Sequence, residues 1–104
     1  MKKLQKRVVK DFLDVVILVE LKKGLPKSGY DLVVMVGRRY GVSLSSGTIY
    51  SLLYSLERDG LIEGRSTSRK RVYTLTSEGE EVTCKFLRLK KEALNMLQEL
   101  FLAA

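Results

Sequence analysis

Four cations clustered around one predicted turn are the residues best suited to a defined chemical task in this sequence. Arg65, Arg69, Lys70 and Arg71 lie within seven residues that contain no carboxylate. Such side chains bind phosphate oxygens, and a group of them supplies the sequence-independent part of DNA affinity. A solvated turn is the alternative, because charged hairpin tips are common. The absence of any opposite charge leads us to favour a contact with DNA.

Groups for catalysis or metal binding are scarce. The 104 residues include no histidine and a single cysteine, Cys84. A histidine-based triad therefore has no base, a zinc site lacks its usual ligands, and an intrachain disulfide cannot form. We expect no enzyme activity, no metal and no cofactor. Cys84 could sense redox state, but we favour the role of a small hydrophobic residue in packing.

The net charge of +7 is unevenly distributed along the chain. Residues 1–27 carry eight cations and three carboxylates, and residues 61–76 carry four and one, whereas residues 28–60 are balanced. This distribution suits a polyanionic partner. The first cations either contact DNA or only solubilise the chain, and the sequence leaves both open for Lys2, Lys3, Lys6, Arg7 and Lys10.

A membrane partner is not expected. The most apolar run, residues 15–19, lies between Asp14 and Glu20. It is far shorter than the roughly 20 residues that a membrane-spanning helix needs. We therefore expect a cytoplasmic protein.

Glycines and the single proline divide the chain into predicted elements. Helices are expected at residues 4–22, 28–41, 45–60 and 76–102, with Ser28 and Asp31 spaced as a capping box. Strands are expected at residues 61–65 and 71–75. Because a two-stranded hairpin is marginally stable alone, it must pack against the helices. The fold class is mainly α with a small β-hairpin, a winged helix-turn-helix with a long C-terminal dimerisation helix. We expect a DNA-binding domain over residues 1–76 and a dimerisation helix over residues 77–104.

The third predicted helix has two distinct sides. At about 100° per residue, one side gathers the apolar residues Ile49, Leu52, Leu53 and Leu56. The opposite side is polar and has no carboxylate in its first three turns, so it can enter a major groove; its members are Gly47, Tyr50, Ser51, Tyr54 and Arg58, with Thr48 and Ser55 on the flank. Free backbone N–H groups at Gly47 and Thr48 could also bind a phosphate.

The tyrosines have alternative roles. Tyr50 and Tyr54 could be half-buried aromatic residues that pack on the hairpin, although we favour contact with DNA. For Tyr30 we favour packing in the core or at the helix cap over contact with a phosphate.

Three ordered blocks resemble a known family. Residues 27–32 (KSGYDL), 44–63 (LSSGTIYSLLYSLERDGLIE) and 69–80 (RKRVYTLTSEGE) are similar to segments of the PadR-like transcriptional regulators. In that family these segments open the second helix, form the recognition helix, and form a wing strand with the start of the next helix. The resemblance covers about half of the chain, and we expect a short member with one C-terminal helix.

The resemblance implies a winged-helix repressor that dimerises through its C-terminal helix and binds a palindromic operator. It carries the recognition role to Ser46, Gly47, Thr48, Tyr50 and Ser51, and the wing role to residues 65–71. We add Ser28 and Tyr54 to the expected DNA contacts. Ser28 stands where many members have histidine, and Ser46 and Ser51 stand where many have proline, so base preferences do not transfer. Without tryptophan, the aromatic drug-binding pore of some relatives does not transfer either.

The last predicted helix has more apolar surface than a small domain can cover. A heptad-like seam runs along it, widened by neighbouring apolar positions; the expected interface residues are Val82, Phe86, Leu89, Ala93, Leu94, Leu97, Leu100 and Phe101. We expect a symmetric homodimer in which the first and last helices of two chains pack together. The alternative is that this helix folds back over its own domain.

Together these patterns predict a regulator that binds double-stranded DNA in a sequence-specific manner. Two other classes are left open, a non-specific architectural DNA-binding protein and a winged-helix module for protein interaction. A small-molecule effector is also left open, because an apolar crevice in a dimer has the same residue types as a core.

Overall fold

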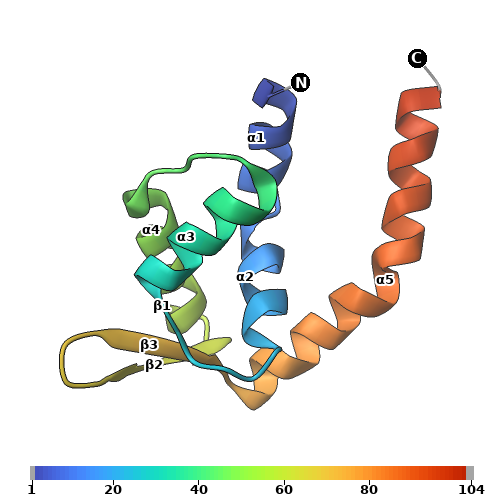
Figure 1. The fold of residues 1–104 in the computed structure, drawn as a ribbon. Coiled ribbons are helices and arrows are strands. Elements are labelled where there is room, and N and C mark those ends of the chain that lie inside the picture. The colour runs from blue at the N-terminus through green and yellow to red at the C-terminus, as the bar shows by residue number, and fades with distance from the viewer. Residues whose placement is uncertain (1, 103–104) are drawn as a thin grey trace.

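Five helices and three strands follow one another along residues 2–102, the part of the chain that the computed structural model describes, apart from the side chain of Lys2 (Figure 1). The helices are α1 (Lys2–Asp11), α2 (Leu13–Leu21), α3 (Gly29–Tyr40), α4 (Ser46–Arg58) and α5 (Ser77–Leu102). The strands are β1 (Lys27–Ser28), β2 (Ile62–Ser66) and β3 (Arg71–Leu75). Within these residues, no helix combines the length and the apolar character needed to cross a membrane. The expected dimerisation helix included residues 103 and 104, which lie outside the described part.

The first predicted helix, residues 4–22, is wrong as a single element. The backbone leaves helical geometry at Phe12 (φ −108°, ψ 19°) and divides the segment into α1 and α2. Helical hydrogen bonds still cross the break, from Phe12 N–H to the Val8 carbonyl and from Val16 N–H to the Phe12 carbonyl. Beyond it, the carboxylate of Asp14 accepts the Val15 N–H at 2.8 Å, a local bond that competes with the helix. The break is therefore a kink that gives α1 its own direction.

Local capping determines where α3 and α4 begin. The Ser28 hydroxyl accepts the Asp31 N–H at 3.1 Å, and the Asp31 carboxylate accepts the Ser28 N–H at 2.9 Å. This reciprocal pair confirms the predicted capping box. The bond from the Ser28 backbone also lowers the pKa of Asp31. Ser45 caps α4 with its own side chain, because its hydroxyl accepts the Thr48 N–H at 3.2 Å.

The hairpin is part of a larger sheet than the sequence predicted. The strand order is β1-β3-β2, with antiparallel pairing on both sides of β3. β1 has only two residues, and it pairs Lys27 with Tyr73 and Ser28 with Val72. The expectation of two strands is therefore wrong, and β2 also begins one residue later than predicted. The third strand ties the segment before α3 to the hairpin.

The core forms where α2, α3 and α4 meet. Every residue of α2 is buried or half-buried, whereas α3 and α4 each bury one side. Ile49 and Leu53 are fully buried, Leu56 is nearly so, and Leu52 packs against them. The predicted inner side of the third helix is therefore confirmed.

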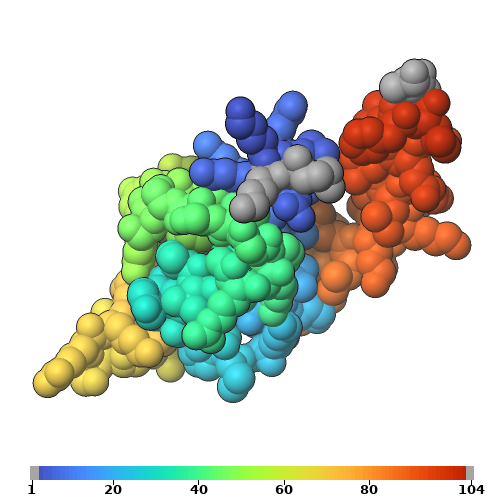
Figure 2. All heavy atoms as spheres, turned by 45° about the horizontal axis from the view of Figure 1, so that its top comes forward, coloured from blue at the N-terminus to red at the C-terminus, as the bar shows by residue number. Residues whose placement is uncertain are grey.

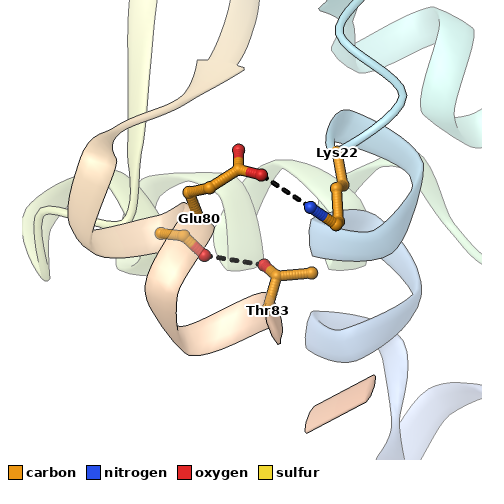
Figure 3. A network of polar contacts seen from close by, with 4 residues as sticks. Lys22, Glu80 and Thr83 are labelled. Carbon is orange, nitrogen blue, oxygen red and sulfur yellow. Dashed lines mark hydrogen bonds and ion pairs between the residues drawn. The ribbon is translucent and has the colours of Figure 1, made fainter. Parts of the chain in front are cut away.

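Polar contacts attach the base of α5 to the domain. Thr76 donates its hydroxyl hydrogen to the Gly60 carbonyl at 2.6 Å and accepts the Gly79 N–H at 3.0 Å. One turn later, the buried Thr83 donates to the Gly79 carbonyl at 2.7 Å, and Glu80 pairs with Lys22 of α2 at 2.6 Å (Figure 3). The first turns of α5 are thereby fixed against α2 and the sheet.

The second half of α5 leaves the domain. The helix bends and its far end stands apart from the other helices (Figure 1), and every residue from 88 to 102 is exposed. The alternative that the last helix folds back over its own domain is therefore wrong for this half.

Candidate nucleic-acid interface

The outer side of α4 is exposed and polar, opposite to its buried side. Ser46, Gly47 and Ser51 are exposed there, and Tyr50 and Tyr54 keep 47% and 68% of their surface accessible. Buried Ile49 and exposed Tyr50 are neighbours in sequence, so the boundary between the two sides is sharp. The structure thus brings together the residues expected to enter a groove, and their contact with DNA stays a prediction.

Tyr50 lies against the start of α3. A Cβ atom at Gly29 would come within 2.3 to 2.8 Å of the Tyr50 ring and hydroxyl, so a larger residue there would require the ring to move. Tyr50 therefore packs on the first turn of α3 and still exposes about half of its surface. Tyr54 instead has the guanidinium of Arg58 5.9 Å from its ring centroid. This is a cation–π contact between residues one turn apart.

Tyr30 is 70% exposed, so our preference for core or cap packing at this residue is wrong. The reason is geometric, because Leu32 is fully buried and a residue two positions earlier lies about 200° away around the helix. Tyr30 and the capping residue Ser28 line a hollow of about 320 Å³ together with Tyr50 and three cations of the hairpin, namely Arg69, Lys70 and Arg71.

The first turn of α4 differs in one respect from the prediction. We expected free N–H groups at Gly47 and Thr48, but the Thr48 N–H already donates to Ser45. The Thr48 hydroxyl lies 2.8 Å from that of Ser45 as well. Thr48 is therefore part of the helix cap, whereas Gly47 is exposed.

The β2–β3 hairpin, the predicted wing, projects from the body of the molecule (Figure 2). Its turn is closed by Thr67, whose N–H and hydroxyl both donate to the Lys70 carbonyl, at 2.7 and 3.0 Å. Arg65, Arg69 and Lys70 are exposed around this turn. A polyanion can therefore reach these cations from outside.

Arg71 differs from the other cations because it is engaged within the chain. Its guanidinium donates to the carboxylate of Glu57 on α4 at 2.5 Å, and this hydrogen bond raises the pKa of Arg71. The same Glu57 oxygen accepts the Gly64 N–H at 3.3 Å. Arg71 also lies over Gly64, where an added Cβ would come within 2.4 Å of its Nε. These contacts tie both strands of the wing to the end of α4.

Sequence reasoning missed the role of Glu57. The sequence showed only that the first three turns of this helix have no carboxylate, and Glu57 lies beyond them. A partner 14 positions away in another element leaves no periodic signal. In the structure Glu57 joins the predicted recognition helix to the predicted wing.

A second polar link holds the end of α3. Glu20 of α2 is buried, and its carboxylate accepts a hydrogen bond from Lys23 at 2.9 Å and forms an ion pair with Arg39 at 3.0 Å. Burial raises the pKa of Glu20, but the bonds from these two cations outweigh it, so that the pKa lies below its ordinary value. The ionised carboxylate thus connects α2 to the last turn of α3.

Apolar surface gathers at the other end of the molecule. A groove of about 590 Å³ is lined by Leu4 and Val8 of α1 and Phe12 at the kink, together with Ala93 and Leu97 of α5. Six of the expected interface residues are large, apolar and exposed, namely Phe86, Leu89, Leu94, Leu97, Leu100 and Phe101. Val82 is different, because it packs against the core of its own domain.

The sequence and the fold have known relatives. The model of the transcriptional regulator PadR-like family matches residues 17–85, about two thirds of the chain. The chain belongs to this family. Its fold is accordingly a winged helix-turn-helix with a long C-terminal helix. None of the curated proteins matches the sequence.

Several solved structures of the family resemble this PadR-like chain. A PadR family regulator from Clostridium difficile is 28% identical over 86% of this chain and 98% of its own, with a TM-score of 0.72. A PadR-like regulator from Bacillus cereus shares the fold, at 24% identity, with a TM-score of 0.77 over 91% of this chain and 96% of its own. Bacillus subtilis PadR, solved with operator DNA, is 33% identical over 72% of this chain, with a TM-score of 0.66, and the match spans 46% of that protein.

Proposed function

We propose that this PadR-like protein binds double-stranded DNA sequence-specifically as a homodimer and represses transcription by occupying a palindromic operator. In this proposal, α4 enters the major groove and the exposed cations of the wing contact phosphates. Occupancy of a promoter blocks the polymerase, so repression is the expected outcome.

The observation that carries the proposal is the exposed side of α4 beside the cations of the wing. Hydroxyl and phenol groups can bind base edges there, and the backbone contacts come from Arg65, Arg69 and Lys70. Glu57 is the only carboxylate of α4, and its pairing with Arg71 removes most of the repulsion that it would exert on phosphates. The relative from Bacillus subtilis, solved on its operator, supports this choice of partner.

The uncovered apolar surface supports the homodimer. The second half of α5 exposes several leucines and Phe101, which no other described part of the chain covers. A second copy related by a two-fold axis would bury this surface in an isologous interface. Two copies of α4 could then reach successive major grooves about 34 Å apart, which is why a palindromic site is expected.

Selection of bound duplexes from a random pool, followed by affinity measurements at several salt concentrations, tests the DNA part. We expect an inverted repeat to emerge and Ser51→Ala to change the ranking of its half-site sequences. Arg69→Ala combined with Lys70→Ala should weaken binding to every duplex and reduce the salt slope by about 1 to 2, since each phosphate contact contributes about 0.9.

Arg88→Ala combined with Lys91→Ala is the matched control, because it removes the same charge from exposed positions of α5. If both pairs of substitutions change the salt slope equally, the wing has no special role. Selection without any sequence preference would instead favour an architectural DNA-binding protein. Failure to bind any duplex at low salt would favour a module for protein interaction.

Size-exclusion chromatography with light scattering tests the dimer. Leu97→Glu places a charge in the apolar groove and should shift the protein toward monomer. Gln98→Glu adds the same charge at the adjacent exposed position, about 100° away around the helix, and should leave the dimer intact. A dimer that persists in Leu97→Glu would remove this part of α5 from the interface.

A further inference from the structure

α1 has a basic side and an apolar side. At about 100° per residue, Lys3, Lys6, Arg7 and Lys10 fall within roughly 100° of arc. The apolar residues Leu4 and Val8 lie on the other side of the helix, and with Phe12 at the kink they line the groove shared with α5. The two sides of α1 are therefore available for different partners.

The basic side of α1 reaches the flank of α4. Lys10 lines a surface hollow of about 460 Å³ together with Thr48, Ser51 and Ser55 of α4. On the opposite flank of α4, Tyr50 shares its hollow with Arg69 and Lys70 of the wing. Cations thus lie on both sides of the α4 surface proposed to enter the major groove.

These cations of α1 are accessible. Lys3, Lys6 and Lys10 are exposed, and among the side chains that the structure describes none of them has a carboxylate within 4 Å. Arg7 makes one exposed pair with Asp11 at 4.0 Å, a contact of little energetic weight. Seven residues separate Lys3 from Lys10, which corresponds to roughly 10 Å of helix. That length equals about three base-pair steps measured along the axis of a duplex.

The order of the elements determines which phosphates α1 could reach. The hollows and the groove place the wing beside α4, α4 beside α1, and α1 beside α5. Figure 2 shows the same order, with the wing and the free end of α5 at opposite ends of the molecule. In a dimer formed through α5 and the apolar side of α1, α1 therefore lies closer to the two-fold axis than α4, and the wing lies farther from it.

We infer that the basic side of α1 binds the phosphates of the DNA segment between the two half-sites. This inference rests on the proposed function, because it requires a dimer with α4 in the major groove. The wing then contacts phosphates on the outer flank of each half-site, and the two α1 helices contact phosphates of the central segment. The central segment contributes affinity without being read by α4.

The test uses the duplex that the wild-type chain selects from a random pool, in three forms. One form is unmodified, one carries neutral methylphosphonate linkages between the half-sites, and one carries them outside the half-sites. Lys6→Ala combined with Lys10→Ala should reduce the salt slope on unmodified DNA by about 1 to 2. Neutral linkages in the central segment should lower the DNA affinity of the wild type clearly more than that of this variant. Neutral linkages outside the half-sites should lower the affinity of both proteins equally.

Lys85→Ala combined with Lys91→Ala is the control, because it removes two exposed lysines from α5. Its salt slope should equal that of the wild type, and circular dichroism and light scattering should show all three proteins folded and dimeric. An unchanged slope in the α1 variant would mean that these lysines only solubilise the chain. Equal sensitivity of wild type and variant to the central linkages would overturn the central placement. In either case the proposed function would stand if the wild type still selects an inverted repeat, and it would fail only if no site is selected.

Discussion

Substitution of Gly79 by alanine tests how closely α5 is attached to the rest of the domain. Gly79 is buried in the first turn of α5, and an added Cβ would lie 1.9 Å from the carbonyl oxygen of Leu61 and 2.9 Å from its carbonyl carbon. These are backbone atoms, so no change of rotamer can relieve the clash. The same Leu61 oxygen accepts the Thr76 N–H at 3.1 Å. Either α5 or the residue before β2 must move, and that bond is strained with it.

The magnitude follows from two opposing effects. Overpacking costs about 1 to 3 kcal/mol, whereas alanine in place of glycine within a helix gains roughly 0.5 to 1 kcal/mol. We therefore expect Gly79→Ala to lower the free energy of unfolding by about 1 to 2 kcal/mol. Gly37→Ala in α3 is the matched control, because no atom of the described residues outside its own helical surroundings lies within 4 Å of its added Cβ. It should raise the free energy of unfolding by about 0.5 to 1 kcal/mol.

Thermal unfolding followed by circular dichroism distinguishes the two variants. At about 4 to 8 °C per kcal/mol, Gly79→Ala should lower Tm by roughly 5 to 15 °C, whereas Gly37→Ala should raise it by a few degrees. Protein concentration must be held constant, because dimerisation makes Tm depend on concentration. A Tm for Gly79→Ala equal to or above that of Gly37→Ala would refute the argument that backbone contact limits this position.

Three further substitutions test the polar links and the tyrosine of the interface. Glu57→Ala releases Arg71 and removes a carboxylate, so affinity for random duplex should rise in binding assays while preference for the selected site falls; an unchanged ratio of the two would contradict the link. In Glu20→Gln, urea unfolding should give a lower free energy of unfolding than in the wild type. This difference should have its full size above pH ~4.3, the ordinary pKa of glutamate, and should disappear as the pH falls through the lower pKa of Glu20 in the folded state. A difference independent of pH would contradict ionic stabilisation. Gly29→Ala should displace the Tyr50 ring and alter sequence preference while Tm changes little, and unchanged preference would show that Tyr50 does not contact bases.

Local signals in the sequence were sufficient for much of the fold. Ser28 and Asp31 lie three residues apart, and their reciprocal hydrogen bonds involve no other element. The buried side of α4 follows from helical periodicity, since Ile49 and Leu53 recur one turn apart. The exposed side of α4 was predicted by the same argument.

Features that depend on contact between distant segments were missed. β1 has two residues and no alternating pattern, and it exists because Lys27 meets Tyr73 of β3. The break at Phe12 interrupts an apolar pattern that continues from α1 into α2, so periodicity carried no sign of it. The pairing of Glu57 with Arg71 likewise requires the wing to return to the end of α4.

The sequence by itself determined the last three helices, the hairpin, the sites of positive charge and the family, because capping, periodicity and motif spacing act over a few residues. Only the tertiary structure decided how these parts are arranged around α4. It paired Arg71 with Glu57 and left the other cations of the wing exposed, and it placed Lys10 of α1 on the opposite flank. The physical reason is that packing of the core fixes the relative positions of helices whose own sequences specify only which side is buried.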